Sequence, residues 1–243
     1  RITSKHTRTG CKLLRAMNVI ITGASRGIGF ELVQQFLKAG DAVFCLTRNL
    51  DPLKAIAHAN LKSYSTDLSS QESMNEAAAF IKNEVTQIDY IIHNAGSLVN
   101  KPYETISYSE LEIVYKVNVF APYFLTQQLL PLLGKKTKAH IVNISSMGGF
   151  QGSSKFAGLS AYSSSKAALV GLTECLAEEL KDKNISVNCL AIGAVQTEML
   201  AEAFPGYQAP LSPKQMAEYI YDFATKGHLY YNGKILPVSS STP

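Results

Sequence analysis

The sequence contains little that would support a disulfide-bonded, membrane-spanning or metal-binding protein. Tryptophan is absent from its 243 residues, and the four cysteines (Cys11, Cys45, Cys175 and Cys189) show no CxxC spacing and no clustering with histidine. Isolated thiols of this kind are typical of reduced proteins, so we expect mostly buried cysteines, a cytoplasmic location and no metal site. No apolar run approaches the ~18 residues of a membrane-spanning helix, so we expect no membrane partner.

Acidic residues are missing from the first sixteen positions, which carry five basic side chains. The net charge of +4 for the whole chain therefore leaves −1 for the remainder, and charge gives a nucleic-acid-binding role little support. Residues 1–16 have the composition of a leader or transit peptide, and equally of an appendage before a natural start at Met17. We favour a disordered appendage and expect the catalytic domain at residues 17–243.

Short apolar runs alternate with helical patterns along residues 17–243, without an internal repeat or a low-complexity linker. The runs predict strands at 18–22, 42–47, 61–66, 88–93, 139–144, 185–191 and 234–238. Because the runs are continuously apolar rather than alternating, the strands should be buried on both faces, as in a parallel sheet. We therefore predict a single α/β domain of the doubly wound Rossmann type, with about seven parallel strands and helices on both faces.

Capping residues predict where several helices begin and end. Ser69, Ser109 and Ser212 are each followed three positions later by Glu or Gln, which is the spacing of a capping box. The helix that begins at Ser109 should continue to about residue 133. Asp51 before a proline predicts another helix start, and Gly40 should end the first helix as a C-cap.

A glycine-rich turn follows the first expected strand, where residues 22–29 read TGASRGIG. Glycines at this point allow a tight turn and let backbone N–H groups approach a pyrophosphate at a helix N-terminus. An ordinary glycine-rich turn without a ligand is the alternative. The expected dinucleotide-binding residues of the turn are Gly23, Ser25, Arg26, Gly27, Ile28 and Gly29.

The end of the second expected strand distinguishes between the two nicotinamide dinucleotides. A carboxylate there would accept the ribose 2′-hydroxyl of NAD, but this strand ends at Thr47 and is followed by Arg48. Arg26 and Arg48 could both pair with a 2′-phosphate through charge-assisted hydrogen bonds. We therefore predict NADP(H) as the cofactor, with NAD(H) second; the alternative is that both arginines are solvated surface charges.

The third and fourth expected strands also end in residues that suit a ligand. Asp67 and Leu68 follow the third strand, where a carboxylate could accept a hydrogen bond from an adenine amino group or simply start a helix. Asn94, Ala95 and Gly96 follow the fourth strand, where small residues let a ring or a ribose lie against the backbone; an ordinary turn is the alternative. Both segments are expected to contact the cofactor because ligands bind at the carboxyl ends of the strands.

Two further polar positions point to the same end of the sheet. Ser145 and Ser146 end the fifth strand, so a hydroxyl should face the crevice at the strand ends. Asn118 lies among apolar residues in the middle of a helical pattern, and a buried amide must find partners. A structural hydrogen bond and a role in the site remain open for Asn118.

Tyr162 and Lys166 lie four residues apart in a helical pattern, so they share one helix face. A Lys ammonium roughly 5 Å from a phenol, at an effective dielectric of about 20, favours the phenolate by about 3 kcal/mol. The pKa of the phenol would fall from its usual value near 10, which would make it a usable general acid or base. A surface lysine beside a half-buried tyrosine is the alternative.

Taken in order, these residues resemble the short-chain dehydrogenase/reductase family over roughly residues 17–238, and 3-oxoacyl-carrier-protein-reductase-like members most of all. The resemblance implies that Tyr162 is the general acid in carbonyl reduction and the base in alcohol oxidation. It implies that Lys166 lowers the pKa of Tyr162 and holds the nicotinamide ribose, and that Ser146 hydrogen-bonds the substrate oxygen. Asn118 would hold a water that connects Lys166 to solvent.

The family pattern also implies that Val195 and Thr197 contact the nicotinamide. The sequence departs from the pattern at His93, where the family commonly has Asn, and at Ile192, where it usually has Pro before Gly193. We take His93 as tolerated and not catalytic. The usual Gly-Gly after the last strand is absent.

We therefore predict an NADP(H)-dependent oxidoreductase that interconverts a carbonyl and a secondary alcohol by hydride transfer. A dinucleotide-binding sensor or scaffold without turnover is the alternative. The substrate should be a small or medium, partly apolar molecule, and the resemblance implies a homodimer or homotetramer. The pocket is expected to be lined by Phe150, Phe156, Leu159, Met199, Leu200, Phe204 and Tyr207, for which ordinary packing is the alternative.

Overall fold

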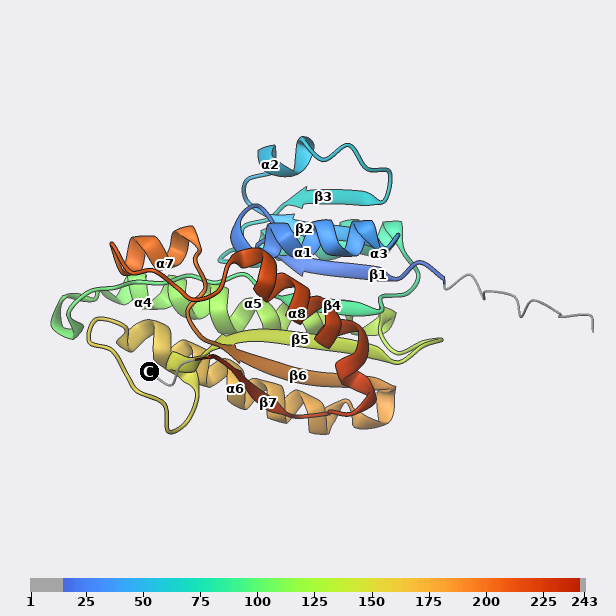
Figure 1. The fold of residues 1–243 in the computed structure, drawn as a ribbon. Coiled ribbons are helices and arrows are strands. Elements are labelled where there is room, and N and C mark those ends of the chain that lie inside the picture. Colours follow the sequence, from blue (N-terminus) through green and yellow to red (C-terminus); the bar gives the residue numbers. More distant parts are fainter. Residues whose placement is uncertain (1–14, 241–243) are drawn as a thin grey trace, which may run out of the picture.

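Seven parallel strands form one sheet in the computed structural model, which describes residues 15–240 (Figure 1). Their order is β3-β2-β1-β4-β5-β6-β7, and every neighbouring pair is parallel. The prediction of about seven parallel strands is confirmed, but the expected burial on both faces does not hold for the edge strands β3 and β7, whose residues are only partly buried or exposed. The strands are β1 (Asn18–Thr22), β2 (Ala42–Thr47), β3 (Leu61–Ser65), β4 (Tyr90–His93), β5 (Ala139–Ser146), β6 (Ile185–Ile192) and β7 (Ile235–Val238).

Helices cover both faces of this sheet. They are α1 (Gly27–Lys38), α2 (Asp51–Lys54), α3 (Gln71–Glu84), α4 (Tyr108–Tyr115), α5 (Ala121–Leu129), α6 (Ser160–Glu179), α7 (Glu198–Ala203) and α8 (Pro213–Lys226). Figure 1 shows α1 and α8 in front of the sheet and α3, α5 and α6 behind it. None of the helices within residues 15–240 is long and apolar enough to cross a membrane.

The alternation of side chains along each strand builds two cores. Val19 and Ile21 of β1 pack in the cluster that includes α1 and α8, whereas Ile20 packs in the cluster that includes α3, α5 and α6. All three side chains are fully buried. The sheet therefore needs continuously apolar strands, which is the pattern that predicted it.

The cysteines are free thiols in the described chain. Cys45 on β2 and Cys189 on β6 are buried, as expected, but Cys175 on α6 is exposed. Cys11 lies outside the described residues. Within residues 15–240, no group of three or more His, Cys, Asp and Glu side chains is placed to hold a metal ion.

Two helices are capped by a serine other than the one that the sequence predicted. Ser70, not Ser69, caps α3, because Ser69 donates from both its backbone N–H and its hydroxyl to Asp67. α4 begins two residues before the prediction, at a capping box formed by Ser107 and Glu110. Both errors arise where serines are closely spaced and more than one of them satisfies the local rule.

The remaining helix ends agree more closely with the sequence. Ser212 caps α8 with the predicted box. Gly40 follows the end of α1 with a φ of +88°, a conformation that favours glycine. Asp51 is the first residue of α2 rather than its cap, and Leu50 at the cap position makes no side-chain cap hydrogen bond.

The long helix predicted from Ser109 to about residue 133 is present, but its hydrogen bonding changes along its length. α4 passes into a π-helical turn, η2 (Lys116–Phe120), which continues directly into α5 and then into the 3-10 turn η3 (Leu130–Leu132). Asn118 is at the centre of the π-helical turn and is fully buried. Such turns widen a helix locally and are frequent at functional sites.

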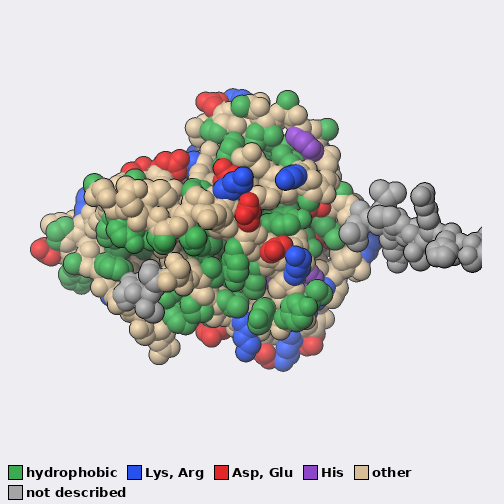
Figure 2. All heavy atoms as spheres, in the orientation of Figure 1, with side chains coloured by type: hydrophobic (Ala, Val, Ile, Leu, Met, Phe, Trp, Pro, Cys, Tyr) green, Lys and Arg blue, Asp and Glu red, His purple; other side chains and the backbone are tan. Residues whose placement is uncertain are grey.

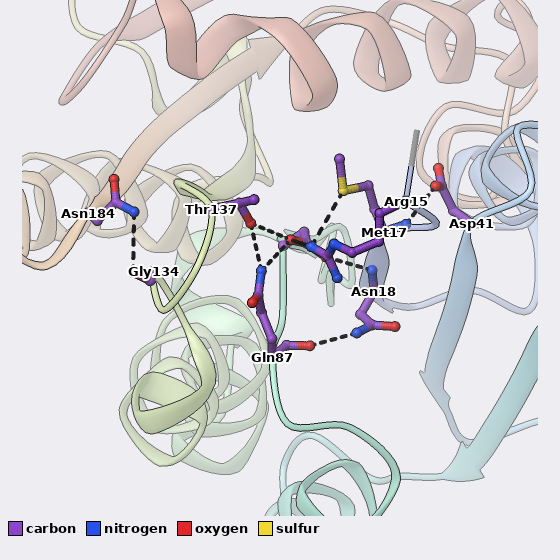
Figure 3. Close-up of polar contacts among 9 residues, drawn as sticks. Arg15, Met17, Asn18, Asp41, Gln87, Gly134, Thr137 and Asn184 are labelled. Carbon is purple, nitrogen blue, oxygen red and sulfur yellow. Dashed lines mark hydrogen bonds and ion pairs between the residues drawn. The ribbon is translucent and has the colours of Figure 1, made fainter. Parts of the chain in front are cut away.

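A buried carboxylate joins the amino ends of several strands (Figure 3). Asp89, directly before β4, is 1% exposed and accepts hydrogen bonds from the Asn18 backbone N–H at 2.9 Å and from the Thr137 hydroxyl at 2.7 Å. The Gln87 amide also donates to it at 2.9 Å, and Arg15 forms an ion pair with it. Arg15 falls within the predicted appendage, so that segment contributes to the fold at its end; residues 1–14 lie outside the described chain.

We expect Asp89→Ala to lower the free energy of unfolding by about 3 kcal/mol, because it leaves the buried Gln87 amide and the part-buried donors of Asn18 and Thr137 without their acceptor. Urea unfolding followed by circular dichroism measures the change. The control is Asp51→Ala, which removes an exposed pair with Lys54 and should change stability by less than about 1 kcal/mol. Equal effects of the two substitutions would contradict this account of the network.

Candidate active site

A cavity of about 1030 Å³ lies at the carboxyl ends of the strands, where the sheet topology predicts a ligand. Two of the predicted site residues, Gly29 and Asn118, do not line it. The predicted residues that do line it are Gly23, Ser25, Arg26, Gly27, Ile28, Arg48, Asp67, Leu68, Asn94, Ala95, Gly96, Ser146, Tyr162, Lys166, Val195 and Thr197.

The turn after β1 has the geometry of an anion-binding site. Gly23 and Gly27 have positive φ angles of +68° and +55°. α1 begins at Gly27, its N-cap residue Arg26 makes no side-chain cap hydrogen bond, and its first turn holds no acidic residue. The first backbone N–H groups and the positive end of the helix dipole are therefore available to a phosphate.

Gly29 does not line the cavity, but close packing around it leaves no room for a side chain. A Cβ atom at Gly29 would lie 2.2 Å from the Gly23 carbonyl oxygen and 2.6 Å from the Asn94 Nδ2. A Cβ at Gly23 would lie 2.8 Å from the Ala95 Cα. The turn after β1 and the segment after β4 therefore approach so closely that side chains at these glycines would force them apart.

Hydrogen bonds hold these two segments in that position. Asn94 donates from Nδ2 to the carbonyl oxygens of Thr22 and Gly23, at 3.1 Å each. The Ala95 backbone N–H donates to the Thr22 hydroxyl at 3.1 Å. The Asn94 side chain therefore shapes the turn, while the small residues after it form part of the cavity wall.

The ionisable residues at the ends of β2 and β3 lie in one part of the cavity. Asp67 accepts hydrogen bonds from the N–H and the hydroxyl of Ser69, at 2.9 and 2.7 Å. These bonds, with a smaller contribution from the charge of Arg48, lower the pKa of Asp67. Arg26 pairs at 3.3 Å with Glu202 of α7, and both side chains are more than half exposed.

Tyr162 and Lys166 lie together in the first turns of α6, with Lys166 Nζ 5.8 Å from the centre of the Tyr162 ring. Burial raises the pKa of the Tyr162 phenol, and a hydrogen bond with Ser146 lowers it. Burial also lowers the pKa of Lys166 to about 8. The pKa of Tyr162 is therefore raised in this structure rather than lowered as expected, because burial disfavours the charged phenolate and outweighs the Ser146 hydrogen bond.

The two serines at the end of β5 have different positions. The Ser146 hydroxyl bonds with Tyr162 and accepts from the Gly148 N–H at 3.1 Å, at the cavity wall. Ser145 is 1% exposed and donates to the Lys166 carbonyl oxygen at 2.9 Å. The Ser146 hydroxyl is therefore the one beside Tyr162, whereas the Ser145 hydroxyl holds the backbone of Lys166.

The side chain of Asn118 forms hydrogen bonds with Ser97 and Ser165. Its Oδ1 accepts from the Ser97 N–H at 2.8 Å, and its Nδ2 donates to the Ser97 carbonyl and to the Ser165 hydroxyl at 2.9 Å each. Ser165 in turn donates to the Tyr162 carbonyl oxygen at 2.7 Å. A continuous path of buried hydrogen bonds thus leads from the π-helical turn to the backbone of Tyr162.

Sequence reasoning missed Ser165, although its place three residues after Tyr162 puts it on the same helix face. It also missed α7, since no helix was predicted between the sixth strand and the helix that begins at Ser212. Thr197 caps α7 by accepting from the Leu200 N–H at 3.2 Å, and the good helix formers of Glu198–Ala203 that follow could have revealed it.

The predicted pocket aromatics separate into two groups. Phe156, Phe204 and Tyr207 line the cavity, together with the expected aliphatic residues of the same segments, but Phe150 does not.

His93 bonds to the Thr126 hydroxyl at 2.9 Å, and burial lowers its pKa to about 3. A neutral, hydrogen-bonded His93 agrees with the expectation that it is tolerated and not catalytic.

Comparisons with known proteins agree with this geometry. A family model described as short chain dehydrogenase matches residues 17–208. The chain is 33% identical over 237 residues to a 3-oxoacyl-[acyl-carrier-protein] reductase of Aquifex aeolicus, covering 90% of this chain and 94% of that one. It is similar to the Pseudomonas aeruginosa RhlG/NADP active-site complex (TM-score 0.82, 28% identity, 94% and 96% covered). It is also similar to a 4-hydroxyisoleucine dehydrogenase complexed with NADH (TM-score 0.82, 25% identity, 93% and 98% covered).

We expect Ser165→Ala to lower the turnover number for carbonyl reduction about tenfold, because one Asn118 donor loses its acceptor and Tyr162 loses a restraint. The Michaelis constant for NADPH should change less than twofold. The control is Ser164→Ala, which removes a similar bond to the Ala161 carbonyl within the same helix. Steady-state kinetics with matched thermal unfolding would test this, and an equal loss in the control would contradict it.

Proposed function

Because the chain belongs to the short-chain dehydrogenase family, we propose that it is an NADP(H)-dependent oxidoreductase that interconverts a carbonyl and a secondary alcohol. The observation that carries this proposal is the hydrogen bond between Tyr162 and Ser146, with Lys166 beside them, in the cavity that also holds the glycine turn after β1. A proton donor, an oxygen-binding hydroxyl and an anion-binding turn thus share one cavity.

In reduction, Tyr162 would donate the phenolic proton to the substrate oxygen, and in oxidation the phenolate would accept it. The raised pKa of Tyr162 keeps the phenol protonated at neutral pH, which suits the reductive direction. Ser146 would donate a hydrogen bond to the same oxygen, where negative charge develops. The nicotinamide, when bound, supplies or accepts the hydride.

Lys166 would keep positive charge beside the phenol and hold the nicotinamide ribose. Its ammonium already donates to the Ile144 carbonyl oxygen at 2.8 Å, and its pKa of about 8 leaves it mostly protonated at pH 7. Asn118 would support Lys166 and Tyr162 through the hydrogen bonds of Ser97 and Ser165.

The cavity residues fit a dinucleotide. The turn Gly23–Gly29 has no room for side chains at Gly23 and Gly29 and offers free N–H groups, so it would hold the pyrophosphate. Arg48 and Arg26 would hold the 2′-phosphate, and Arg26 would exchange its exposed pair with Glu202 for it. The NADP complex named above supports NADP(H), and the NADH complex keeps NAD(H) as the second choice.

A dinucleotide sensor or scaffold without turnover finds no support in these relatives, which are a reductase and a dehydrogenase.

A homodimer or homotetramer and a cytoplasmic location stay predictions. Exposed apolar side chains support self-association, since Tyr108, Ile113, Phe120 and Tyr123 along α4, η2 and α5 are each more than two-fifths exposed.

We expect Tyr162→Phe and Lys166→Ala to separate chemistry from cofactor binding. Tyr162→Phe should lower turnover by about a thousandfold while NADPH affinity changes little, because only the proton donor is lost. Lys166→Ala should weaken both, since the ammonium has two roles. Fluorescence titration with NADPH and initial rates measure the two quantities. Equal loss of affinity in both variants would show that the roles are wrongly divided, and unchanged turnover in Tyr162→Phe would exclude the mechanism.

We expect Arg48→Ala to raise the Michaelis constant for NADPH about tenfold and that for NADH less than twofold, because only NADPH carries the 2′-phosphate. Initial rates with each cofactor at a fixed carbonyl substrate measure the ratio. Lys54→Ala is a matched control, since it removes a basic side chain that does not line the cavity. Wild-type turnover with NADH equal to that with NADPH would overturn the cofactor assignment.

A further inference from the structure

Charged side chains occupy only part of the cavity wall. Arg26, Arg48 and Asp67 follow β1, β2 and β3, and Glu198 lies near the turn after β1, with an oxygen 3.5 Å from a Cβ placed on Gly27. The remaining charge is the Lys166 ammonium, which is bonded to the Ile144 carbonyl. The other described residues that line the cavity carry no charged side chain.

Apolar side chains from three segments of the chain, 98–117, 147–159 and 199–207, form a part of the wall that we call the outer wall. Figure 2 shows hydrophobic side chains in a band across the half of the molecule that holds α4 and α7. The Phe156 and Phe204 rings meet at this wall in an edge-to-face arrangement, with centroids 6.0 Å apart and planes at 71°. The residues of the outer wall are Leu98, Ile113, Val117, Met147, Phe156, Leu159, Met199, Leu200, Ala203, Phe204 and Tyr207.

Basic residues in the loops that carry this wall already have partners. Lys101 forms an ion pair with Glu110. Lys155 donates to the carbonyl oxygens of Phe150 and Ser153, at 2.9 and 3.0 Å. Neither lysine lines the cavity, so a carboxylate or phosphate on the substrate would enter an apolar region without a cation in its wall, which is costly.

Asn100 and Lys101 together connect the two segments that carry the aromatic pair. Asn100 donates from Nδ2 to the Ala203 carbonyl oxygen at 2.7 Å, next to Phe204. The neighbouring Lys101 N–H donates to the Gly158 carbonyl at 3.1 Å, two residues from Phe156. A Cβ at Gly158, where φ is +85°, would lie 2.1 Å from the Asn100 Oδ1. The aromatic pair is thus fixed by the segment after β4, which favours a preformed binding wall over a random collapse of two loops.

We infer that the substrate is an uncharged ketone or secondary alcohol with an apolar, preferably aromatic substituent that packs against Phe156 and Phe204. Its oxygen would lie at Ser146 and Tyr162. Two rings in edge-to-face contact present both a ring face and a ring edge to a third ring, which favours an aromatic group over an aliphatic one of equal area. This inference rests on the proposed function, which names the reaction but not the substrate.

The first experiment compares NADPH oxidation with four carbonyl compounds. We expect kcat/KM for 4-phenyl-2-butanone to exceed that for its para-carboxylate, for acetoacetyl-coenzyme A and for 2-butanone by at least about tenfold each. Faster turnover of the carboxylate or the coenzyme A thioester would overturn the substrate class and leave the proposed function standing. Turnover of none of the four would overturn both.

The second experiment changes the wall. Phe156→Ala and Phe204→Ala should each raise the Michaelis constant for 4-phenyl-2-butanone about tenfold while that for 2-butanone changes less than twofold. Phe150→Ala is the matched control, because Phe150 belongs to the same segment as Phe156 but does not line the cavity. An unchanged NADPH dissociation constant shows that the variants fold. Equal losses with both ketones, or the same loss in the control, would contradict the assignment of the aromatic pair.

Discussion

A buried ammonium group constrains the structure around it. Lys166 is 3% exposed, and a charge in such a place is unfavourable unless polar groups surround it. The Ile144 carbonyl accepts a hydrogen bond from the ammonium, and Ser145 at the end of the same strand holds the Lys166 backbone. The start of α6 is therefore fixed against the end of β5. Tyr162, one helical turn earlier, is fixed with it, and so is its distance from Ser146.

Much of the fold could be predicted because the sheet imposes its pattern on the sequence. A parallel strand covered on both faces is mostly apolar, so runs such as Val19–Ile21 are recognisable without any knowledge of their neighbours. The cavity was predictable for a related reason. Once the strands are known to be parallel, the residues after them meet at one edge, and Arg48, Asp67 and Asn94 could be placed together before their contacts were known.

What the sequence concealed depends on surroundings rather than on spacing. Ser107 and Ser109 both begin valid capping boxes, and only tertiary packing selects the first. The spacing of Tyr162 and Lys166 indicated their proximity correctly, but a Coulomb estimate from spacing omits the cost of burial, which reverses the direction for Tyr162. Asn100 could not be recognised either, since its partners lie in segments far along the chain.

The strand order has a consequence for how the protein folds. All pairings in the sheet are parallel, so each requires a long crossover to close before its hydrogen bonds form. Folding should be correspondingly slow for the size of the chain, because the entropy of loop closure is lost before the stabilising contacts between strands form. Val195 and Thr197 follow β6, so the cavity cannot be complete until β6 has docked on β5. During synthesis, the cavity residues that follow β1 to β4 leave the ribosome before those that follow β6. The cavity would therefore be complete, and the protein active, only after the last quarter of the chain is made.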